Sequence, residues 1–218
     1  MNKPRICASI VNNDFEAIGR VAPLVDLFEV RIDLIGPDWR EVAGQLGKPW
    51  IACNRKSEEG GIWGGSEEER ITELLSALGL GAAMVDIELS AENLNDVVAQ
   101  IKGQAECLIS FHHLEGTPPF GTMKGIAQRQ IAAGADIVKV VTTARKFEDN
   151  MSSMQLIQEF PGKRVVAFAM GPLGLVSRLL CPLAGGDFIY ASVESGEEAA
   201  PGQMTVGEMR RIYEMVKG

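Results

Sequence analysis

The chain has 218 residues, of which 46% are hydrophobic and 23% charged, a composition that predicts a folded protein with a sizeable core and excludes a disordered chain. Its formal net charge of −8 argues against a general nucleic-acid-binding protein, which would present a basic stripe. The amino-terminal segment is too short and polar for a secretory signal, and no apolar stretch approaches the roughly 20 residues that span a bilayer. We therefore expect a soluble, cytoplasmic protein with no nucleic-acid or membrane partner.

The four cysteines, Cys7, Cys53, Cys107 and Cys181, lie far apart in the sequence, without a CxxC motif or a Cys/His cluster. In a reducing cytoplasm this spacing favours buried free thiols over disulfides or a metal centre. The sequence therefore predicts no metal ligands among the cysteines.

Short β-branched segments alternate with amphipathic segments along the whole chain. The expected strands are 6–11, 27–33, 49–54, 83–89, 107–112, 135–141, 164–170 and 187–193. The expected helices begin near Asp14, Asp38, Ser66, Ala91, Gly121, Lys146, Gly171 and Thr205. Asp14 is suited to cap the first helix, and Ser66 with Glu69 three residues later has the pattern of a capping box.

Regular strand–helix alternation predicts a parallel sheet of the α/β class. Eight such units close most naturally into a (β/α)8 TIM barrel, with an open doubly wound sheet as the alternative. No GxGxxG follows the first strand and no GxxxxGK[ST] occurs, which argues against a nucleotide-binding fold. No linker interrupts the chain, so we expect a single domain over residues 1–218.

Active sites of such barrels lie at the carboxyl ends of the strands, where polar residues in apolar strands are therefore informative. Glu29, Arg31 and Asp33 alternate with apolar residues in the second strand, so they are expected to share one face. In a barrel that face points inward, where charges must be paired or bind a ligand. The alternative is an exposed edge strand of an open sheet.

Lys139 interrupts the apolar sixth strand, Ile137 to Val141. A lysine held among apolar groups and near other cations loses its proton more readily, and the neutral amine can attack a carbonyl. A single lysine in a strand is otherwise more often found at a solvent-facing end.

His112 and His113 are the only histidines in the chain, and they follow the apolar part of the fifth strand. Adjacent strand residues face opposite ways, so only one of the two is expected to enter the barrel. A histidine at the carboxyl end of a barrel strand is well placed to act as a general acid–base group.

Three further segments carry candidate binding residues. Arg55 and Glu59 lie in the loop after the third strand, beside two glycines that allow close backbone approach to a ligand. Arg178 lies in the segment that runs from the end of the seventh strand into its helix, where it suits fork-like binding of a carboxylate or, alternatively, a surface salt bridge. Residues 199–203 end a long loop after the last strand, which is typical of a lid.

These motifs, in this order, resemble the type I 3-dehydroquinate dehydratases over essentially the whole chain. The similar segments are 29–33, Arg55 with 59–61, 86–89, 110–112, 135–139, 170–171 with 177–178, and 201–203. Each motif is modest alone, but seven in the right order and spacing are specific.

The resemblance implies dehydration of 3-dehydroquinate to 3-dehydroshikimate, a step of aromatic amino-acid biosynthesis, without a metal or organic cofactor and in a homodimer. It implies that Lys139 forms an imine with the ring ketone, that His112 carries the protons, and that Glu59 orients and charges the histidine. Arg178 is similar to the family's carboxylate clamp. The remaining residues similar to the family's substrate-binding groups are Ser9, Glu29, Arg31, Arg55 and Gln203. The surrounding arginines are expected to attract an anionic substrate and to help keep the lysine neutral.

The chain departs from the family at three positions: Ala199 stands where serine is common, and Phe111 and His113 flank the histidine. His112 is preferred as the acting histidine because it stands two residues after Ser110, as in the family.

Two rival functions stay open at the level of sequence. A class I aldolase shares the barrel and the imine-forming lysine but makes or breaks a carbon–carbon bond. A barrel that has lost catalysis could serve as a binding or scaffold protein, although it would not need a lysine, a histidine and a lid in this arrangement.

Overall fold

A computed structural model describes residues 3–217, so Met1, Asn2 and Gly218 of the expected 1–218 domain lie outside the described residues. The strands are β1 (Ile6–Ile10), β2 (Leu27–Arg31), β3 (Trp50–Cys53), β4 (Met84–Glu88), β5 (Glu106–His112), β6 (Ile137–Thr143), β7 (Arg164–Met170) and β8 (Ile189–Ser192). Each strand begins and ends within two residues of an expected strand.

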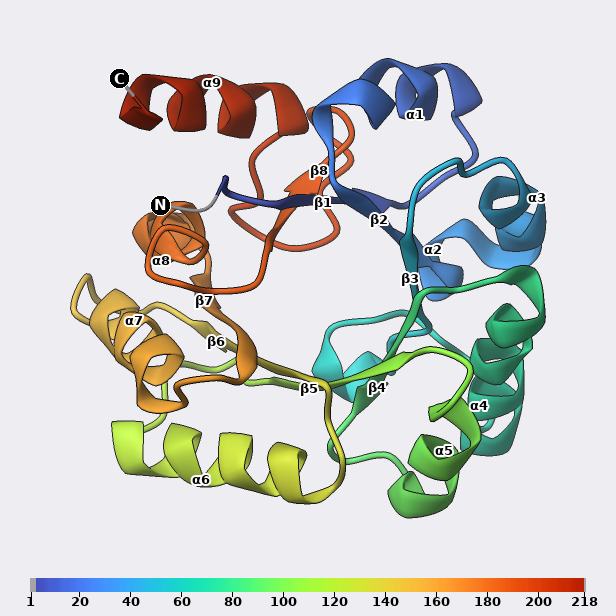
Figure 1. The fold of residues 1–218 in the computed structure, drawn as a ribbon, viewed down its shortest axis with the longest axis horizontal. Helices are drawn as coiled ribbons and strands as arrows, with labels where there is room; N and C mark the ends of the chain where they lie inside the picture. Colours follow the sequence, from blue (N-terminus) through green and yellow to red (C-terminus); the bar gives the residue numbers. More distant parts are fainter. Residues whose placement is uncertain (1–2, 218) are drawn as a thin grey trace.

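The helices surround the strands as an outer ring (Figure 1). They are α1 (Phe15–Val21), α2 (Ile32–Ile35), α3 (Trp39–Gly44), α4 (Glu67–Ser76), α5 (Leu94–Ile101), α6 (Phe120–Ala132), α7 (Asp149–Glu159), α8 (Leu175–Leu180) and α9 (Val206–Lys217). The expected helix starts are confirmed in detail at α1 and α4: Asp14 accepts a hydrogen bond from the Ala17 amide, and Ser66 and Glu69 form a capping box. Within residues 3–217, no helix is long and apolar enough to cross a membrane.

The strands form one parallel sheet in the order β7-β6-β5-β4-β3-β2-β1-β8. This order follows the chain around a ring, whereas a doubly wound sheet would reverse direction in the middle. At the seam between β7 and β8, the Asp187 amide donates to the Val165 carbonyl at 2.9 Å. The expected (β/α)8 barrel is therefore confirmed, in a nearly closed form, and the open sheet is excluded.

The strands are buried on both faces, because one face packs on the helices and the other fills the barrel. Apolar residues such as Val30, Val85 and Ile109 are fully buried in the core. The four cysteines are free and buried, as the sequence predicts.

The expected end of the second strand is wrong by two residues, and this error changes the element to which Asp33 belongs. We expected the second strand to continue through Asp33, with three alternating charges on one face, but β2 ends at Arg31 and Asp33 lies in the short helix α2. The backbone leaves the extended conformation at this point, so the alternation of side chains ends with it. Only Glu29 and Arg31 of the three line the barrel interior.

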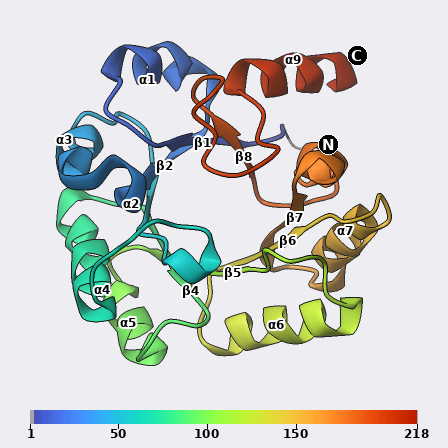
Figure 2. The ribbon, with the colours of Figure 1, turned by 180° about the vertical axis from the view of Figure 1, so that it is seen from behind.

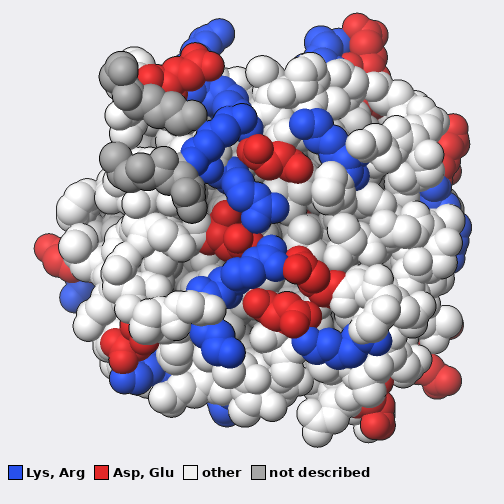
Figure 3. Space-filling model, viewed as in Figure 1, with Lys and Arg blue, Asp and Glu red and all other residues white. Residues whose placement is uncertain are grey.

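The amino-terminal end of the barrel is covered by paired charges, and basic and acidic side chains alternate across the centre of the face in Figure 3. Arg164 binds Asp187 at 2.9 Å and Glu106 at 2.6 Å, while Arg5 binds the same aspartate at 3.1 Å. Since every one of these charges has an opposite partner, this end of the barrel presents a structural ion-pair network.

Figure 2 shows the opposite end, where the chain segments that follow the strands lie over the barrel mouth. The short 3-10 helix Ser57–Glu59 follows β3, and the loop 193–205 follows β8. These two segments bring side chains from outside the strands to the carboxyl end of the barrel.

Candidate active site

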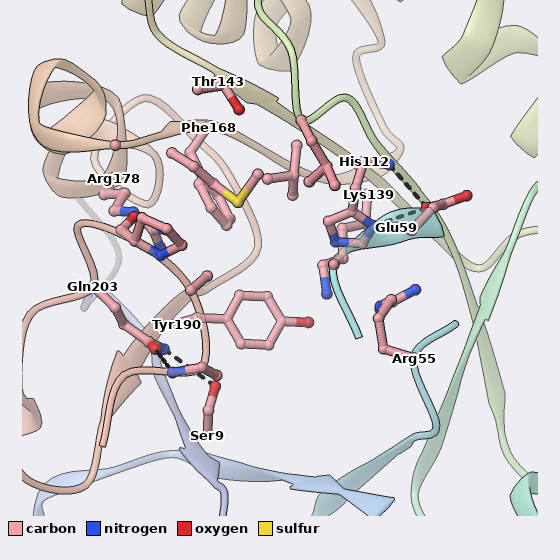
Figure 4. Close-up of a pocket in the computed structure, with 18 of the residues that line it drawn as sticks. Ser9, Arg55, Glu59, His112, Lys139, Thr143, Phe168, Arg178, Tyr190 and Gln203 are labelled. Carbon is pink, nitrogen blue, oxygen red and sulfur yellow. Dashed lines mark hydrogen bonds and ion pairs between the residues drawn. The ribbon is translucent and has the colours of Figure 1, made fainter. Parts of the chain in front are cut away.

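A cavity of about 460 Å³ opens at the carboxyl end of the barrel (Figure 4). Its volume lies within the usual range for sites that bind small molecules. All nine predicted site residues line it: Ser9, Glu29, Arg31, Arg55, Glu59, His112, Lys139, Arg178 and Gln203. Alternate residues of each strand face inward, as on β6, where Lys139, Val141 and Thr143 share the lining.

Lys139 lies in the barrel with only 4% of its surface exposed. Its Nζ donates to Asp86 Oδ2 at 2.8 Å and lies 3.7 Å from Glu29 Oε1. Nζ is also 4.2 Å from the centre of the Tyr190 ring. We expected cations to be the decisive neighbours of this lysine, but the groups that contact it directly are carboxylates, and Arg55 lies behind Asp86.

Asp86 is a permanently charged partner for the lysine. Burial opposes its ionisation, but Arg55 and Lys139 together hold the pKa of Asp86 well below its usual range. Its Oδ1 accepts from the Ser110 hydroxyl at 2.6 Å, so both carboxylate oxygens are bonded. A fixed negative charge beside Nζ stabilises any positive charge on that nitrogen.

Four of the five N–H groups of Arg55 are bonded to protein acceptors. Nη1 donates to Glu88 at 2.8 Å and to Ser110 at 2.7 Å, and Nη2 donates to Asp86 at 2.7 Å and to the Cys53 sulfur at 3.3 Å. The predicted substrate-binding role of Arg55 is therefore limited to its Nε and its charge, because the other four N–H groups hold the carboxylate network in place.

Glu29, Cys53 and Asp86 place one ligand-type atom each within 4.8 Å of one another. Oxygen and sulfur donors of this kind suit a divalent cation. Here, however, the same atoms contact the Lys139 ammonium and the Arg55 guanidinium, and a metal ion would be repelled by both. The positive charge that this cluster holds is supplied by the protein itself.

His112 is held by Glu59 through two bonds. Glu59 Oε2 accepts from the backbone amide of His112 and contacts Nδ1 of its ring, both at 2.9 Å (Figure 4). Glu59 Oε1 accepts from the Ser90 hydroxyl at 2.8 Å. Because the carboxylate is the acceptor in all of these bonds, Nδ1 carries the proton and the Nε2 lone pair is left for the cavity.

Burial shapes the charge state of this pair. It lowers the pKa of His112 well below 6.5, and the nearby Arg55 and Lys139 act in the same direction. Burial also raises the pKa of Glu59 above its usual range. The histidine is therefore neutral at rest and able to accept a proton, with an acidic group in contact to balance the charge it gains.

His113, the neighbouring histidine, points away from this arrangement. Its Nδ1 contacts the Gly116 carbonyl at 3.0 Å and its ring stacks on Phe111. In the described part of the chain only His112 of the two lines the cavity. This outcome follows from the opposite orientation of adjacent strand residues that the sequence predicted.

Arg178 is a buried cation without an anionic partner among the described residues. Its side chain is 1% exposed, and in residues 3–217 no carboxylate forms an ion pair with it. Nη2 donates to the Pro201 carbonyl at 3.2 Å, the guanidinium lies 4.5 Å from the centre of the Phe168 ring, and Nε has no hydrogen-bond partner among the described residues. Burial alone lowers the pKa of Arg178 to about 10, so the side chain stays charged at neutral pH. A buried unpaired guanidinium is a strong binding site for a carboxylate.

Arg31 differs from Arg178 because it has its own carboxylate. Nε and Nη2 bind the two oxygens of Asp33 at 2.9 and 2.7 Å, and Nη1 reaches toward the Ala199 carbonyl at 3.5 Å. Although burial acts in the opposite direction, the bond to Asp33 raises the pKa of Arg31 above its usual range. Nη1, the nitrogen that does not bind Asp33, faces the loop over the cavity.

The loop 193–205 lies down over the barrel mouth. The Pro201 carbonyl accepts from the Gly171 amide at 3.1 Å as well as from Arg178. Gly202 has φ +77°, and a Cβ at this residue would lie 2.7 Å from the Gly171 carbonyl oxygen. Glycine is therefore needed for the loop to approach the end of β7 this closely.

Gln203 links this loop to the lysine. Its Oε1 accepts from the Ala199 amide at 2.8 Å, and its Nε2 donates to the Ser9 hydroxyl at 3.2 Å. Ser9 in turn donates to Glu29 Oε2 at 2.9 Å, and Glu29 faces Lys139. A continuous chain of polar contacts thus connects the loop to the centre of the cavity.

Two residues at this centre received no role from the sequence. Asp86 belongs to a strand in which Asp86 and Glu88 alternate with apolar residues, the same signal that marked Glu29 and Arg31. Tyr190 carried no such signal, because a tyrosine in an apolar strand is typical of a core residue. Only the fold places it beside Lys139.

Comparison with known proteins identifies similar chains. Residues 6–218 match the family described as Type I 3-dehydroquinase. A 3-dehydroquinate dehydratase of Dehalococcoides mccartyi is 43% identical over 216 residues, which cover 99% of this chain and 97% of that protein. One of Methanosarcina mazei is 35% identical over 231 residues, covering 99% and 96%. The crystal structure of 3-dehydroquinate dehydratase from Geobacillus kaustophilus superposes with a TM-score of 0.85 at 26% identity, covering 99% of this chain and 92% of that one.

Proposed function

This chain belongs to the type I 3-dehydroquinase family, and from that premise we propose that it dehydrates 3-dehydroquinate to 3-dehydroshikimate through an imine on Lys139. The observation that carries the proposal is the composition of one buried cavity. It holds a lysine, a neutral histidine and an arginine that lacks an anionic partner among the described residues. These are the groups needed to bind a carboxylate, attack a ketone and move protons.

Substrate binding would begin at Arg178. A carboxylate entering the cavity gives this guanidinium the anionic partner that the described residues do not supply, and Nε provides a free donor for it. Gln203 and the loop over the barrel mouth would then enclose the substrate and exclude water.

Imine formation requires Lys139 to become a neutral amine. The neutral His112 is suited to take its proton, and Nζ then adds to the ketone carbon, whose oxygen leaves as water. The fixed carboxylate of Asp86 beside Nζ would stabilise the positive iminium that results.

The elimination follows from the charge on the iminium, which withdraws electrons and acidifies the adjacent carbon–hydrogen bond. The Nε2 lone pair of His112 would accept this proton, while Glu59 holds the ring and balances the imidazolium charge. The same proton would then pass to the departing hydroxyl, and water would hydrolyse the imine. The proposed steps use neither a metal ion nor an organic cofactor.

Borohydride reduction in the presence of 3-dehydroquinate, followed by peptide mass mapping, tests the proposal. We expect a substrate adduct on Lys139, formation of an ultraviolet-absorbing enone by the untreated enzyme, and no adduct in the Lys139→Ala variant. Lys124→Ala is a matched control, since Lys124 pairs with Glu159 away from the cavity and its loss should leave the adduct intact. An adduct on Lys124 or Lys163, or none at all, contradicts the mechanism.

Three further expectations stay predictions that accompany this proposal. They are the homodimer, the cytoplasmic location and the action of residues 1–218 as one catalytic domain.

A further inference from the structure

The hydroxyl of Tyr190 is a buried polar group that the proposed mechanism does not use. Tyr190 comes from β8, is 4% exposed and lines the cavity (Figure 4). Within residues 3–217 its oxygen has no hydrogen-bond partner. A buried hydroxyl without a partner destabilises a fold, so such a group calls for an explanation.

Some buried polar atoms without a partner lie in the cavity and others lie elsewhere in the described chain. Of the six buried side-chain atoms that lack a partner in the described residues, two belong to residues that line the cavity: Arg178 Nε and Tyr190 Oη. The other tyrosine of the chain, Tyr213, donates to the Leu179 carbonyl at 3.1 Å. The tyrosine outside the site is thus satisfied, whereas the one inside it lacks a partner in the same way as the proposed carboxylate-binding arginine.

The hydroxyl is a proton donor in a fixed position. Burial raises the pKa of Tyr190 well above 10, so the phenol keeps its proton throughout the neutral range. Its ring packs edge-on against Phe188, with 5.3 Å between ring centres, and against Phe168 at 6.3 Å. These contacts fix the direction in which the hydroxyl points.

Tyr190 is also next to the reacting nitrogen. Since Nζ of Lys139 is 4.2 Å from the ring centre and a phenol oxygen lies about 2.8 Å from that centre, the two atoms are no more than about 7 Å apart. When Nζ is bonded to the substrate carbon, the oxygen on that carbon is two covalent bonds away from Nζ. A hydrogen bond of about 2.8 Å from this oxygen then spans most of the remaining distance to the phenol oxygen of Tyr190.

We propose that the Tyr190 hydroxyl donates a hydrogen bond to the substrate oxygen borne by the carbon that Lys139 attacks. This inference rests on the proposed imine mechanism. As the C–N bond forms, the π electron pair of the carbonyl moves onto the oxygen, which takes up the proton released by the nitrogen. Tyr190 stays protonated and holds this oxygen until the C–O bond breaks with its electron pair and the oxygen leaves as water with the proton carried by His112.

The ring and the hydroxyl have separable tasks in this arrangement. The face of the ring stabilises positive charge on Nζ, first as the ammonium and later as the iminium. The hydroxyl acts on the oxygen during addition. Replacing Tyr190 by phenylalanine therefore removes the second task and leaves the first.

The test compares Tyr190→Phe with Tyr213→Phe, a matched control that removes the same atom from a residue that does not line the cavity. For Tyr190→Phe we expect kcat/KM to fall about tenfold or more, and the borohydride-trapped adduct to accumulate correspondingly more slowly in rapid-quench mass spectrometry. Its melting temperature should equal or exceed that of the wild type, because an unpartnered hydroxyl is removed. Tyr213→Phe should lower the melting temperature and leave kcat, KM and the rate of adduct formation unchanged.

Each other outcome overturns the inference. If Tyr190→Phe keeps wild-type kinetics, the hydroxyl touches no reacting oxygen. If KM rises while the adduct forms at the wild-type rate, the hydroxyl contacts a different part of the substrate. If activity and melting temperature fall together, the hydroxyl is structural. A wild-type enzyme that forms no adduct with 3-dehydroquinate refutes the proposed function itself, which distinguishes that failure from the others.

Discussion

Replacing Arg178 with methionine should weaken substrate binding without destabilising the protein. The change removes a buried positive charge that has no anionic partner in the described residues, while it keeps a side chain of similar length in the same space. An arginine that served the fold would give the opposite result.

The size of both effects follows from the structure. Burial lowers the pKa of Arg178 from 12.5 to about 10, and at about 1.4 kcal/mol per tenfold change this corresponds to a penalty of about 3 kcal/mol for the charged form. The variant loses the hydrogen bond to Pro201 and the contact with the Phe168 ring, which contribute about 1 kcal/mol each. The free energy of unfolding should therefore stay constant or rise by about 1 kcal/mol. Loss of a charge-assisted contact with a carboxylate should raise KM about 100-fold.

Thermal melts without ligand and steady-state kinetics measure the two effects. Arg164→Met is the matched control, because Arg164 binds Asp187 and Glu106 at the far end of the barrel. It should lower the melting temperature and leave KM unchanged. If Arg178→Met loses 2 kcal/mol or more of stability while KM stays within threefold of the wild type, Arg178 is a structural residue and the reasoning is refuted.

Two predictions concern His112. His112→Ala should abolish turnover while His113→Ala keeps near-normal turnover, since only His112 lines the cavity; the reverse result in a steady-state assay means that the wrong histidine was assigned. Because the pKa of His112 is well below 6.5 in the folded protein, the unfolded chain takes up a proton below pH 6.5 that the folded chain does not. This residue should thus lower the free energy of unfolding by about 1.4 kcal/mol per pH unit as the pH falls below 6.5, and denaturation curves of His112→Gln should lack that component; an identical pH dependence in the variant would contradict the buried neutral histidine.

Much of the fold was accessible from the sequence because it depends on local patterns. Eight apolar segments separated by amphipathic ones predicted the barrel, and the strand ends were predicted to within a few residues. The N-cap at Asp14 and the capping box of Ser66 and Glu69 were identified from single residues, because each satisfies backbone groups only three residues away. The end of β2 was missed, since the turn into α2 after Arg31 has no local breaker such as glycine or proline.

The candidate site was accessible in part for the same reason. Polar residues that interrupt apolar strands face the inside of a barrel, so Glu29, Arg31 and Lys139 were identified from their positions alone. Asp86 carried the same signal but received no role, because alternation tells which face a side chain occupies and not which residue it meets.

The sequence by itself determined the order of strands and helices and the face on which each site residue lies. Only the tertiary structure decided the partners. Arg55, in the loop after β3, and Arg178, in α8, both line the cavity. Four N–H groups of Arg55 are bonded to Asp86, Glu88, Ser110 and Cys53, whereas Arg178 has no carboxylate among the described residues. The physical reason is that these contacts join strands far apart in the chain, so their distances depend on barrel closure and on the register between strands. The carboxylates beside Lys139 and the unpartnered hydroxyl of Tyr190 follow from that same long-range geometry.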